Sequence, residues 1–373
     1  MPFFPTAPVR IQPYFGWRTH DRLVITARAL RARADSFERG GRWRAFRTML
    51  AQFASHEVAG RAVELEIAAP GGPPRRHAGT TDGEGFVRFD IAFDEPWDLA
   101  PHTVWESVRF HWRNRHGPQS IEGHVIAPGS AAGLAVVSDI DDTIIETGIT
   151  GDFRAVLRNW RRILLEMPEE RLLVPGADVF YSALGGSLAD ADEARPAPPA
   201  GERRPAPHRP FFYVSSSPWN LFSYLVAYIG RRGLPLGPIL LRDWGFDRDT
   251  LGSGSHGDHK RAAIAAIMAQ YPQLQFALIG DDTQGDLPAF AALVAAHPGR
   301  VRAVFVRTTA GAFSPEEEAG RAAIEAAGVP LWLGAAFDKG HEFLAALGLS
   351  GDGEAGQVIA AVADTDRPAI AAQ

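Results

Sequence analysis

Residues 136–150 read VVSDIDDTIIETGIT, and within them an apolar run ends in four acidic or hydroxyl residues spread over five positions. The run is typical of a buried β-strand, so the polar cluster begins where the strand ends. Carboxylates this close together repel one another and resist burial unless a cation or a reaction keeps them there. The stretch therefore predicts a strand end that serves a bound cation, a reaction or both.

From about residue 130 onward, apolar strand-like runs alternate with helical runs. The strand-like runs are LAVVSDID, PFFYVSS, GPILLRDW, QFALIGDD and RVRAVFVRT, and the helical runs are PGADVFYSALGG, WNLFSYLVAYIGRRG, HKRAAIAAIMAQY and LPAFAALVAAHPG. Such alternation predicts right-handed βαβ units and an α/β domain with a Rossmann-like parallel sheet. In such sheets ligands bind beyond the carboxyl ends of the strands.

The residues before this region follow a different pattern. Short runs rich in β-branched and aromatic residues recur between residues 22 and 125, as in RLVITARAL, AVELEIAA, GFVRFDIAF and ESVRFHWRNR. One helical stretch, RWRAFRTMLAQFAS at 42–55, interrupts them. Strands at this spacing predict a smaller β-sandwich-like domain over residues 1–130.

Length and composition set the remaining limits. A chain of 373 residues is long enough for two domains, and we expect the second over residues 131–350. Residues 187–210 are rich in proline, alanine and charge and predict a mobile surface loop, and residues 351–373 predict a flexible tail. The absence of cysteine excludes disulfides and thiolate metal sites, and a net charge of −6 gives no support to nucleic-acid binding. With no secretory signal and no transmembrane segment in the sequence, a cytoplasmic protein is the expectation.

Polar side chains follow three of the predicted strands at the same rim of the sheet. Each cluster alone is typical of a helix cap or a turn. Together, two acidic clusters in one crevice would repel strongly, and a divalent cation is the ordinary remedy. A set of oxygen donors without cysteine suits Mg²⁺. The three clusters are Asp139, Asp141 and Thr143; Ser215, Ser216 and Ser217; and Asp281, Asp282 and Asp286.

These motifs carry a resemblance to a known family. DIDDT fits the first motif of haloacid dehalogenase-superfamily phosphatases, YVSSS the second, Lys260 the third and GDDTQGD the fourth. With the words SSPWNL and GDHK, residues 135–307 resemble the actin-patch-protein type of phosphatidate phosphatase. The resemblance implies a haloacid dehalogenase-type fold with a cap or insertion at about 147–209. It also implies Mg²⁺-dependent hydrolysis of phosphatidate, at a membrane surface, to diacylglycerol and phosphate.

The resemblance also implies catalytic roles for five residues. Asp139 would be the nucleophile that forms an aspartyl-phosphate. Asp141 would protonate the leaving alcohol and then activate water, with Thr143 orienting it. Ser215 would hold a phosphoryl oxygen, and Lys260 would offset negative charge on the phosphate and on Asp139.

Further residues would bind substrate or metal. Ser216 and Asp142 are the expected substrate-binding residues. The expected Mg²⁺ ligands are Asp139, the backbone carbonyl of Asp141, Asp281 and Asp282. Asp286 would ligate the metal through water or support Lys260.

Several alternatives stay open at this point. The substrate could be a soluble phosphomonoester, or the chain could be a non-catalytic adaptor built on the same fold. Ser216 and Ser217 could instead cap the helix that Pro218 opens, and His256 and His259 are more typical of solvated loop residues than of an acid or base. The basic amphipathic stretch 152–167 is compatible with a packed helix and with one lying on an anionic membrane.

Overall fold

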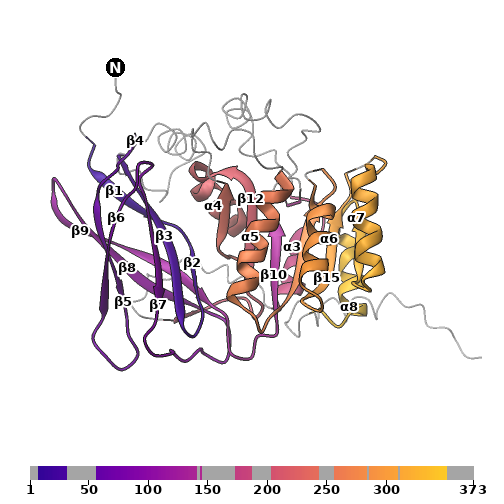
Figure 1. The fold of residues 1–373 in the computed structure, drawn as a ribbon, viewed down its shortest axis with the longest axis horizontal. Helices are drawn as coiled ribbons and strands as arrows, with labels where there is room; N and C mark the ends of the chain where they lie inside the picture. The colour runs from indigo at the N-terminus through magenta and orange to yellow at the C-terminus, as the bar shows by residue number, and fades with distance from the viewer. Residues whose placement is uncertain are drawn as a thin grey trace, which may run out of the picture.

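A computed structural model describes residues 7–31, 56–140, 143–144, 173–186, 203–242, 256–283, 285–309 and 311–350. Within these ranges the chain forms one largely antiparallel sheet and one parallel sheet with helices (Figure 1). The predicted α/β class with a parallel sheet is therefore confirmed. The predicted helix at 42–55, the basic stretch 152–167, most of the expected insertion and the tail 351–373 lie outside the described residues.

The first sheet collects the N-terminal strands. Its main order is β1-β3-β2-β9-β8-β5-β6, with β4 and β7 paired to β3 and β11 paired to β8. The sheet is antiparallel except where β2 pairs with β9. Alternating apolar residues of its strands, among them Leu65 and Phe110, form one buried core. The strands are β1 Val9–Pro13, β2 Gly16–Arg18, β3 Arg22–Arg31, β4 His56–Glu57, β5 Ala62–Ile67, β6 Arg75–Thr80, β7 Phe86–Ala92, β8 Val104–Asn114, β9 Gly117–Ala127 and β11 Arg203–Pro205.

The second sheet has six parallel strands in the order β13-β12-β10-β14-β15-β16. From the central β10 the chain first adds strands on one side and then crosses to add β14 on the other, so the strand order reverses beside β10. In open parallel sheets such a reversal leaves a crevice at the carboxyl ends of the two strands. The strands are β10 Leu134–Asp139, β12 Phe211–Pro218, β13 Ile239–Arg242, β14 Gln275–Asp281, β15 Val301–Arg307 and β16 Leu331–Gly334.

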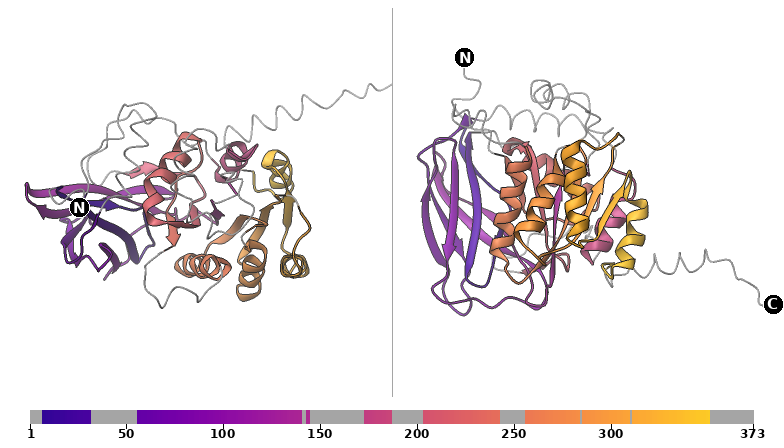
Figure 2. Two further views of the ribbon diagram at one scale, coloured as in Figure 1. Left: turned by 90° about the horizontal axis from the view of Figure 1, so that it is seen from above. Right: turned by 45° about the vertical axis from the view of Figure 1, so that its right-hand side comes forward.

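Helices cover both faces of the parallel sheet (Figure 2). Val136 of β10 joins the core under α3, α4 and α8, whereas Ala135 and Val137 join the core under α5, α6 and α7. Burial on both faces explains why the strand reads as a continuous apolar run. No helix of the described ranges is long and apolar enough to cross a bilayer. The helices are α3 Ala177–Gly185, α4 Phe222–Arg231, α5 His256–Gln270, α6 Asp286–Ala296, α7 Pro315–Ala326 and α8 Gly340–Ala346.

The N-terminal sheet is attached to the segment that follows β12. Trp219 packs on Tyr14, with ring centroids 4.5 Å apart. Asn220 accepts a hydrogen bond of 2.9 Å from Arg28 Nη1, and the Arg28 guanidinium lies 4.4 Å from the centre of the Phe86 ring. The antiparallel sheet therefore holds the residues immediately after the three serines at the end of β12.

Candidate active site

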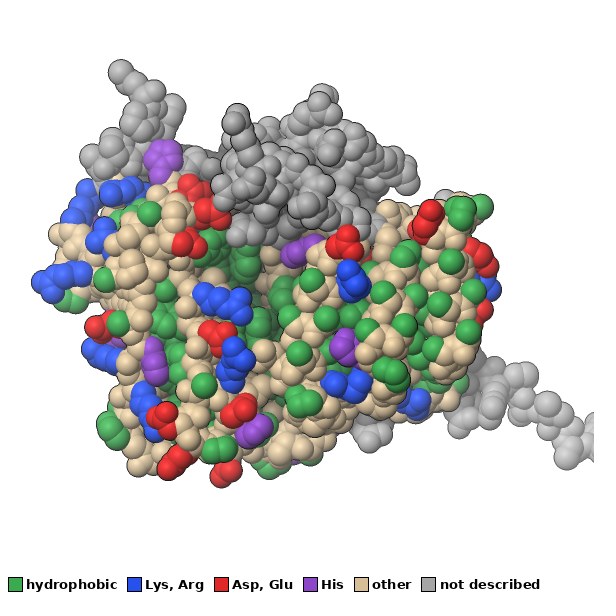
Figure 3. All heavy atoms as spheres, in the orientation of Figure 1, with side chains coloured by type: hydrophobic (Ala, Val, Ile, Leu, Met, Phe, Trp, Pro, Cys, Tyr) green, Lys and Arg blue, Asp and Glu red, His purple; other side chains and the backbone are tan. Residues whose placement is uncertain are grey.

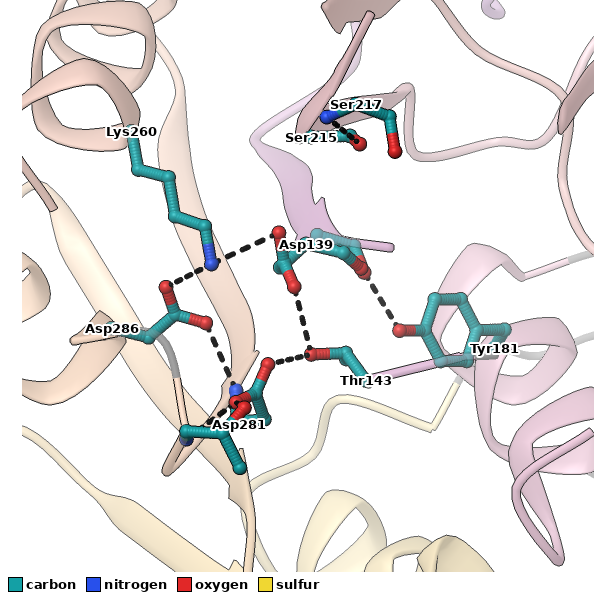
Figure 4. A network of polar contacts seen from close by, with 10 residues as sticks. Asp139, Thr143, Tyr181, Ser215, Ser217, Lys260, Asp281 and Asp286 are labelled. Atoms are coloured by element: carbon teal, nitrogen blue, oxygen red, sulfur yellow. Dashed lines mark hydrogen bonds and ion pairs between the residues drawn. The ribbon is translucent and has the colours of Figure 1, made fainter. Parts of the chain in front are cut away.

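The carboxyl ends of neighbouring parallel strands bring the predicted polar residues together. Asp139 ends β10, Asp281 ends β14, and Ser215 lies near the end of β12. The register sets Asp139 beside Val214 of β12 and Ser138 beside Ile279 of β14. Thr143, which follows β10, is also buried at this rim. Figure 4 shows Asp139, Thr143 and Asp281 close together, with Ser215 to one side of them.

Three carboxylates lie at this centre. One oxygen each of Asp139, Asp281 and Asp286 lies within 4.8 Å of the other two, and all three residues are buried. Asp286 begins α6, and its Oδ2 accepts a hydrogen bond of 3.0 Å from the backbone N–H of Asp281. Gly280 leaves room for this carboxylate, because a Cβ there would lie 2.3 Å from Asp286 Oδ2. Within the motif GDDTQGD, the carboxylate of Asp286 thus holds the backbone of Asp281 in place.

Lys260 is the cation of the cluster. It comes from α5 and is only 1% exposed. Its Nζ lies 3.1 Å from Asp139 Oδ1 and 2.6 Å from Asp286 Oδ1. Burial alone would lower the pKa of Lys260, but Asp139, Asp286 and Asp281 together outweigh burial and raise this pKa. Lys260 is therefore an ammonium ion at neutral pH.

Hydroxyl groups fix the orientation of Asp139. Thr143 Oγ1 lies 3.3 Å from Asp139 Oδ2 and 3.1 Å from Asp281 Oδ2. Its hydroxyl can therefore donate a hydrogen bond to either carboxylate. Ser138 Oγ donates a hydrogen bond of 2.7 Å to the backbone carbonyl of Asp139 and lies 2.7 Å from the Tyr181 hydroxyl. Because the Ser138 proton is used on the carbonyl, Tyr181 is the donor in the second bond.

Ser138 and Tyr181 belong to the site but were not predicted from the sequence. Tyr181 lies in a stretch interpreted only as a helix, and nothing in its spacing indicates that the helix meets β10. The available signal was Ser138, a polar residue inside the otherwise apolar run LAVVSD, because a buried hydroxyl requires a partner.

The charges of the cluster fit a divalent cation. Three carboxylates face one ammonium ion, so full ionisation leaves an excess of negative charge in a buried site. Burial, followed by the neighbouring Asp286 carboxylate, raises the pKa of Asp281 to about 7. Carboxylate oxygens without sulfur or imidazole are the donors that Mg²⁺ prefers. Asp139, Asp281 and Asp286 therefore could hold Mg²⁺.

Asp281→Asn is expected to stabilise the protein in the presence of chelator by about 1–3 kcal/mol at pH 8. The raised pKa means that folding binds a proton between pH values of about 4 and 7, so wild-type stability falls as pH rises through this window. Asparagine removes that loss, and its carbonyl oxygen can still accept the 2.6 Å bond from the backbone N–H of Thr283. Denaturant unfolding of both proteins at pH values from 4 to about 8 measures the effect.

The control is Asp94→Asn, since the Asp94 side chain is 93% exposed and lies outside the site. It should leave the pH dependence of stability unchanged. Mg²⁺ should raise the melting temperature of the wild type and not of Asp281→Asn. If Asp281→Asn is less stable than the wild type at pH 8, the site does not carry an excess of negative charge.

Asp282, a predicted metal ligand, is hydrogen-bonded away from the cluster. Its Oδ1 accepts bonds of 2.9 Å from the backbone N–H of Thr309 and 2.7 Å from the Thr309 hydroxyl. Its Oδ2 lies 3.0 Å from the same N–H. Asp282 thus ties the end of β14 to the loop after β15, while Asp286 takes the third position among the carboxylates.

The serines at the end of β12 are all buried. Ser215 Oγ accepts a hydrogen bond of 3.0 Å from the backbone N–H of Ser217. Strand β12 continues to Pro218, a short 3₁₀ turn follows, and α4 begins at Phe222. Neither Ser216 nor Ser217 occupies an N-cap position, so the alternative capping role is wrong.

Three of the residues singled out in the sequence cannot be placed. Asp141, Asp142 and the side chain of His256 lie outside the described part of the chain, and their roles stay predictions. His259 is half-buried on α5, next to Lys260.

Comparisons with known proteins agree with this site. Residues 134–308 match the family described as phosphatidate phosphatase APP1, catalytic domain. Over 185 residues the chain is 30% identical to phosphatidate phosphatase APP1 of Saccharomyces cerevisiae. That match covers 50% of this chain and 27% of the yeast protein, so the chain spans about a quarter of its relative's length.

Similarities to solved structures are weaker. A β-glucuronidase of Bifidobacterium dentium is 11% identical with a TM-score of 0.25, over 88% of this chain and 60% of that one. A flavohaem-like FAD/NAD-binding domain of nitric oxide dioxygenase from Vibrio cholerae is 8% identical with a TM-score of 0.16, over 81% and 98%. The family match is the informative comparison, and it spans the strands that carry Asp139, Ser215 and Asp281 as well as Lys260. Residues 134–308 of this chain are therefore similar to the phosphatidate phosphatase APP1 catalytic domain.

Proposed function

We propose that this chain is a Mg²⁺-dependent phosphatidate phosphatase that releases diacylglycerol and phosphate at a membrane surface in the cytoplasm. The observation that carries the proposal is the buried contact between Asp139 and Lys260 at 3.1 Å, set in a cluster with Asp281 and Asp286. The match of residues 134–308 to the APP1 catalytic-domain family supports the phosphatase chemistry and the lipid substrate. We further propose that the parallel sheet is of the haloacid dehalogenase type and that the N-terminal strands form a sandwich-like domain.

The proposed reaction proceeds through an aspartyl-phosphate. A carboxylate oxygen of Asp139 forms a bond to phosphorus as the bond from phosphorus to the diacylglycerol oxygen breaks. Asp141 gives its proton to that leaving oxygen. The Asp141 carboxylate then takes a proton from water, whose oxygen attacks phosphorus and displaces Asp139. Phosphate leaves, and both aspartates return to their starting states.

The buried charges of the site support this chemistry. Lys260 balances the negative charge that the phosphoryl oxygens and Asp139 share. Thr143 and the chain from Tyr181 through Ser138 hold the nucleophile in one orientation. Held by Asp139, Asp281 and Asp286, Mg²⁺ would neutralise phosphoryl charge as a Lewis acid. Ser215, buried at the neighbouring strand end, would donate a hydrogen bond to a phosphoryl oxygen.

The proposal predicts that chelator lowers phosphate release from phosphatidate vesicles by at least about 100-fold, because the carboxylates then lack their neutralising cation. Added Mg²⁺ should restore the rate. A malachite-type assay of released phosphate measures both effects. Undiminished hydrolysis in excess chelator would contradict the metal requirement.

Substrate choice is tested in the same assay. Phosphatidate, lysophosphatidate, sugar phosphates and an aryl phosphate are compared under one set of conditions. We expect the highest kcat/KM for phosphatidate. If phosphatidate is hydrolysed no faster than the aryl phosphate, the substrate is a soluble phosphomonoester. If no substrate is hydrolysed, a non-catalytic adaptor is favoured.

A further inference from the structure

Arginine side chains gather around a hollow in the N-terminal sheet, far along the chain from the catalytic motifs. The hollow has a volume of about 390 Å³, within the range of small-ligand sites. Its residues come from the start of β1, the end of β3, the segment before β5 and the turn between β8 and β9. Its lining includes Arg31, Arg61, Arg113 and Arg115, with Val9 and Asn114 between them.

None of these four arginines pairs with a carboxylate of the described residues, and no acidic residue lines the hollow. Arg61 Nη1 donates to the backbone carbonyl of Arg113 at 3.3 Å, and Arg115 Nε lies 3.1 Å from His116 Nε2. The Arg61 Nε group is buried without a hydrogen-bond partner among the described residues. Elsewhere on the same sheet Arg18, Arg22 and Arg76 pair with acids.

Four cations without an acidic partner in the described part of the chain repel one another, so the arrangement favours a bound anion. The chain carries a net charge of −6, and the cluster therefore does not simply reflect a basic protein. Guanidinium groups match phosphate oxygens in a two-pronged geometry. The lining has no aromatic side chain on which a nucleic-acid base could stack. These features favour phosphate groups and disfavour a single-stranded nucleic acid.

The hollow lies at the same end of the molecule as the catalytic rim. Figures 1 and 2 show the start of β1 near the end of the molecule toward which β10 points. Figure 3 shows Lys and Arg side chains gathered at the upper left, over the N-terminal strands. Arg113 and Arg115 are exposed, at and just beyond the end of β8 in its turn to β9. These two side chains are therefore accessible to an anionic surface.

We propose that the arginine hollow, Arg31, Arg61, Arg113 and Arg115, docks the protein on the phosphate headgroups of an anionic bilayer. Docking would hold the catalytic rim near lipid substrate. The binding itself does not depend on the proposed hydrolysis, and it is tested in a protein that cannot hydrolyse lipid.

The test uses the full chain with Asp139→Asn, so that headgroups are not consumed. Co-flotation is measured with phosphatidylcholine vesicles with and without phosphatidate. We expect binding only to the phosphatidate vesicles, weakening as salt is raised. Each arginine near an anionic surface contributes about five-fold in affinity, so Arg113→Gln/Arg115→Gln should bind about 25-fold more weakly. Thermal unfolding verifies that the variant is folded.

The matched control is Arg75→Gln/Arg76→Gln, which removes the same charge at the other end of β5. It should retain vesicle binding. The proposal is overturned if the two double variants bind alike. It is also overturned if Arg113→Gln/Arg115→Gln loses binding of inorganic phosphate but binds vesicles as well as the parent protein does. All proteins in the flotation experiment carry Asp139→Asn. Loss of vesicle binding therefore does not bear on the hydrolysis assay, and absence of hydrolysis does not bear on vesicle binding.

Discussion

Asp139→Asn is expected to lower phosphate release by about 10⁴-fold or more, because an amide cannot replace the attacking carboxylate. The fold should persist, with a change in unfolding free energy of less than about 1 kcal/mol. Asparagine is isosteric, and its carbonyl oxygen can still face the Lys260 ammonium ion that lies 3.1 Å from Asp139. Lys260 also keeps its 2.6 Å ion pair with Asp286. Steady-state phosphate release and denaturant unfolding measure the two quantities.

Asp178→Asn provides the matched control, since Asp178 is exposed on α3 and takes no part in the cluster. Its turnover should stay close to that of the wild type. Retention of more than a few per cent of activity by Asp139→Asn would remove Asp139 as the nucleophile.

Lys260→Met is expected to destabilise the protein by about 3–5 kcal/mol in chelator, because it leaves buried carboxylates without their cation. The methionine side chain is nearly as long as that of lysine. The change in unfolding free energy therefore reports the lost charge and not a lost volume. Mg²⁺ should recover part of this stability, since a metal held by Asp139, Asp281 and Asp286 offsets the same charges. Turnover should remain low even with Mg²⁺ because Lys260 no longer balances the charge of the phosphoryl oxygens.

The chain contains only one other lysine, Lys339, which is exposed. Lys339→Met therefore removes the same group from a solvated position and should change stability by less than about 0.5 kcal/mol. If Lys260→Met unfolds at the same denaturant concentration as Lys339→Met, the three carboxylates are not charged together and the metal site loses its electrostatic basis.

Local patterns were sufficient to predict the parallel sheet. Apolar runs such as LAVVSD and QFALIGD are buried on both faces, so their periodicity identified β10 and β14. Since parallel strands end at one rim, the polar residues after them were expected to converge. The structure brings Asp139, Thr143 and Asp281 together in this way. Lys260 joins them from α5.

Contacts between segments far apart in the chain could not be predicted in the same way. The position of Asp286 depends on a turn that returns it to the backbone of Asp281, and on the missing Cβ of Gly280. The bond between Tyr181 and Ser138 depends on which helix covers β10. Sequence periodicity fixes which face of an element is buried and leaves open which partner it meets.

The rarity of lysine in this chain is a further signal of the site. Almost every basic residue of the chain is arginine, yet the cation in the cluster is lysine. A compact ammonium ion fits between Asp139 and Asp286, at 3.1 and 2.6 Å, where a planar guanidinium requires more space. A rare residue type within a motif is therefore informative even without knowledge of the fold.

Transfer of the phosphoryl group to Asp139 is tested most directly by chemical trapping during turnover. The enzyme is quenched while it hydrolyses phosphatidate with Mg²⁺ and is then reduced with borohydride, which converts an aspartyl-phosphate to homoserine. Mass spectrometry of the peptides should find homoserine at position 139 and at no other aspartate, and none in the chelated sample. Rapid hydrolysis with Asp139 unmodified, or homoserine at Asp281 or Asp286 instead, would contradict the account.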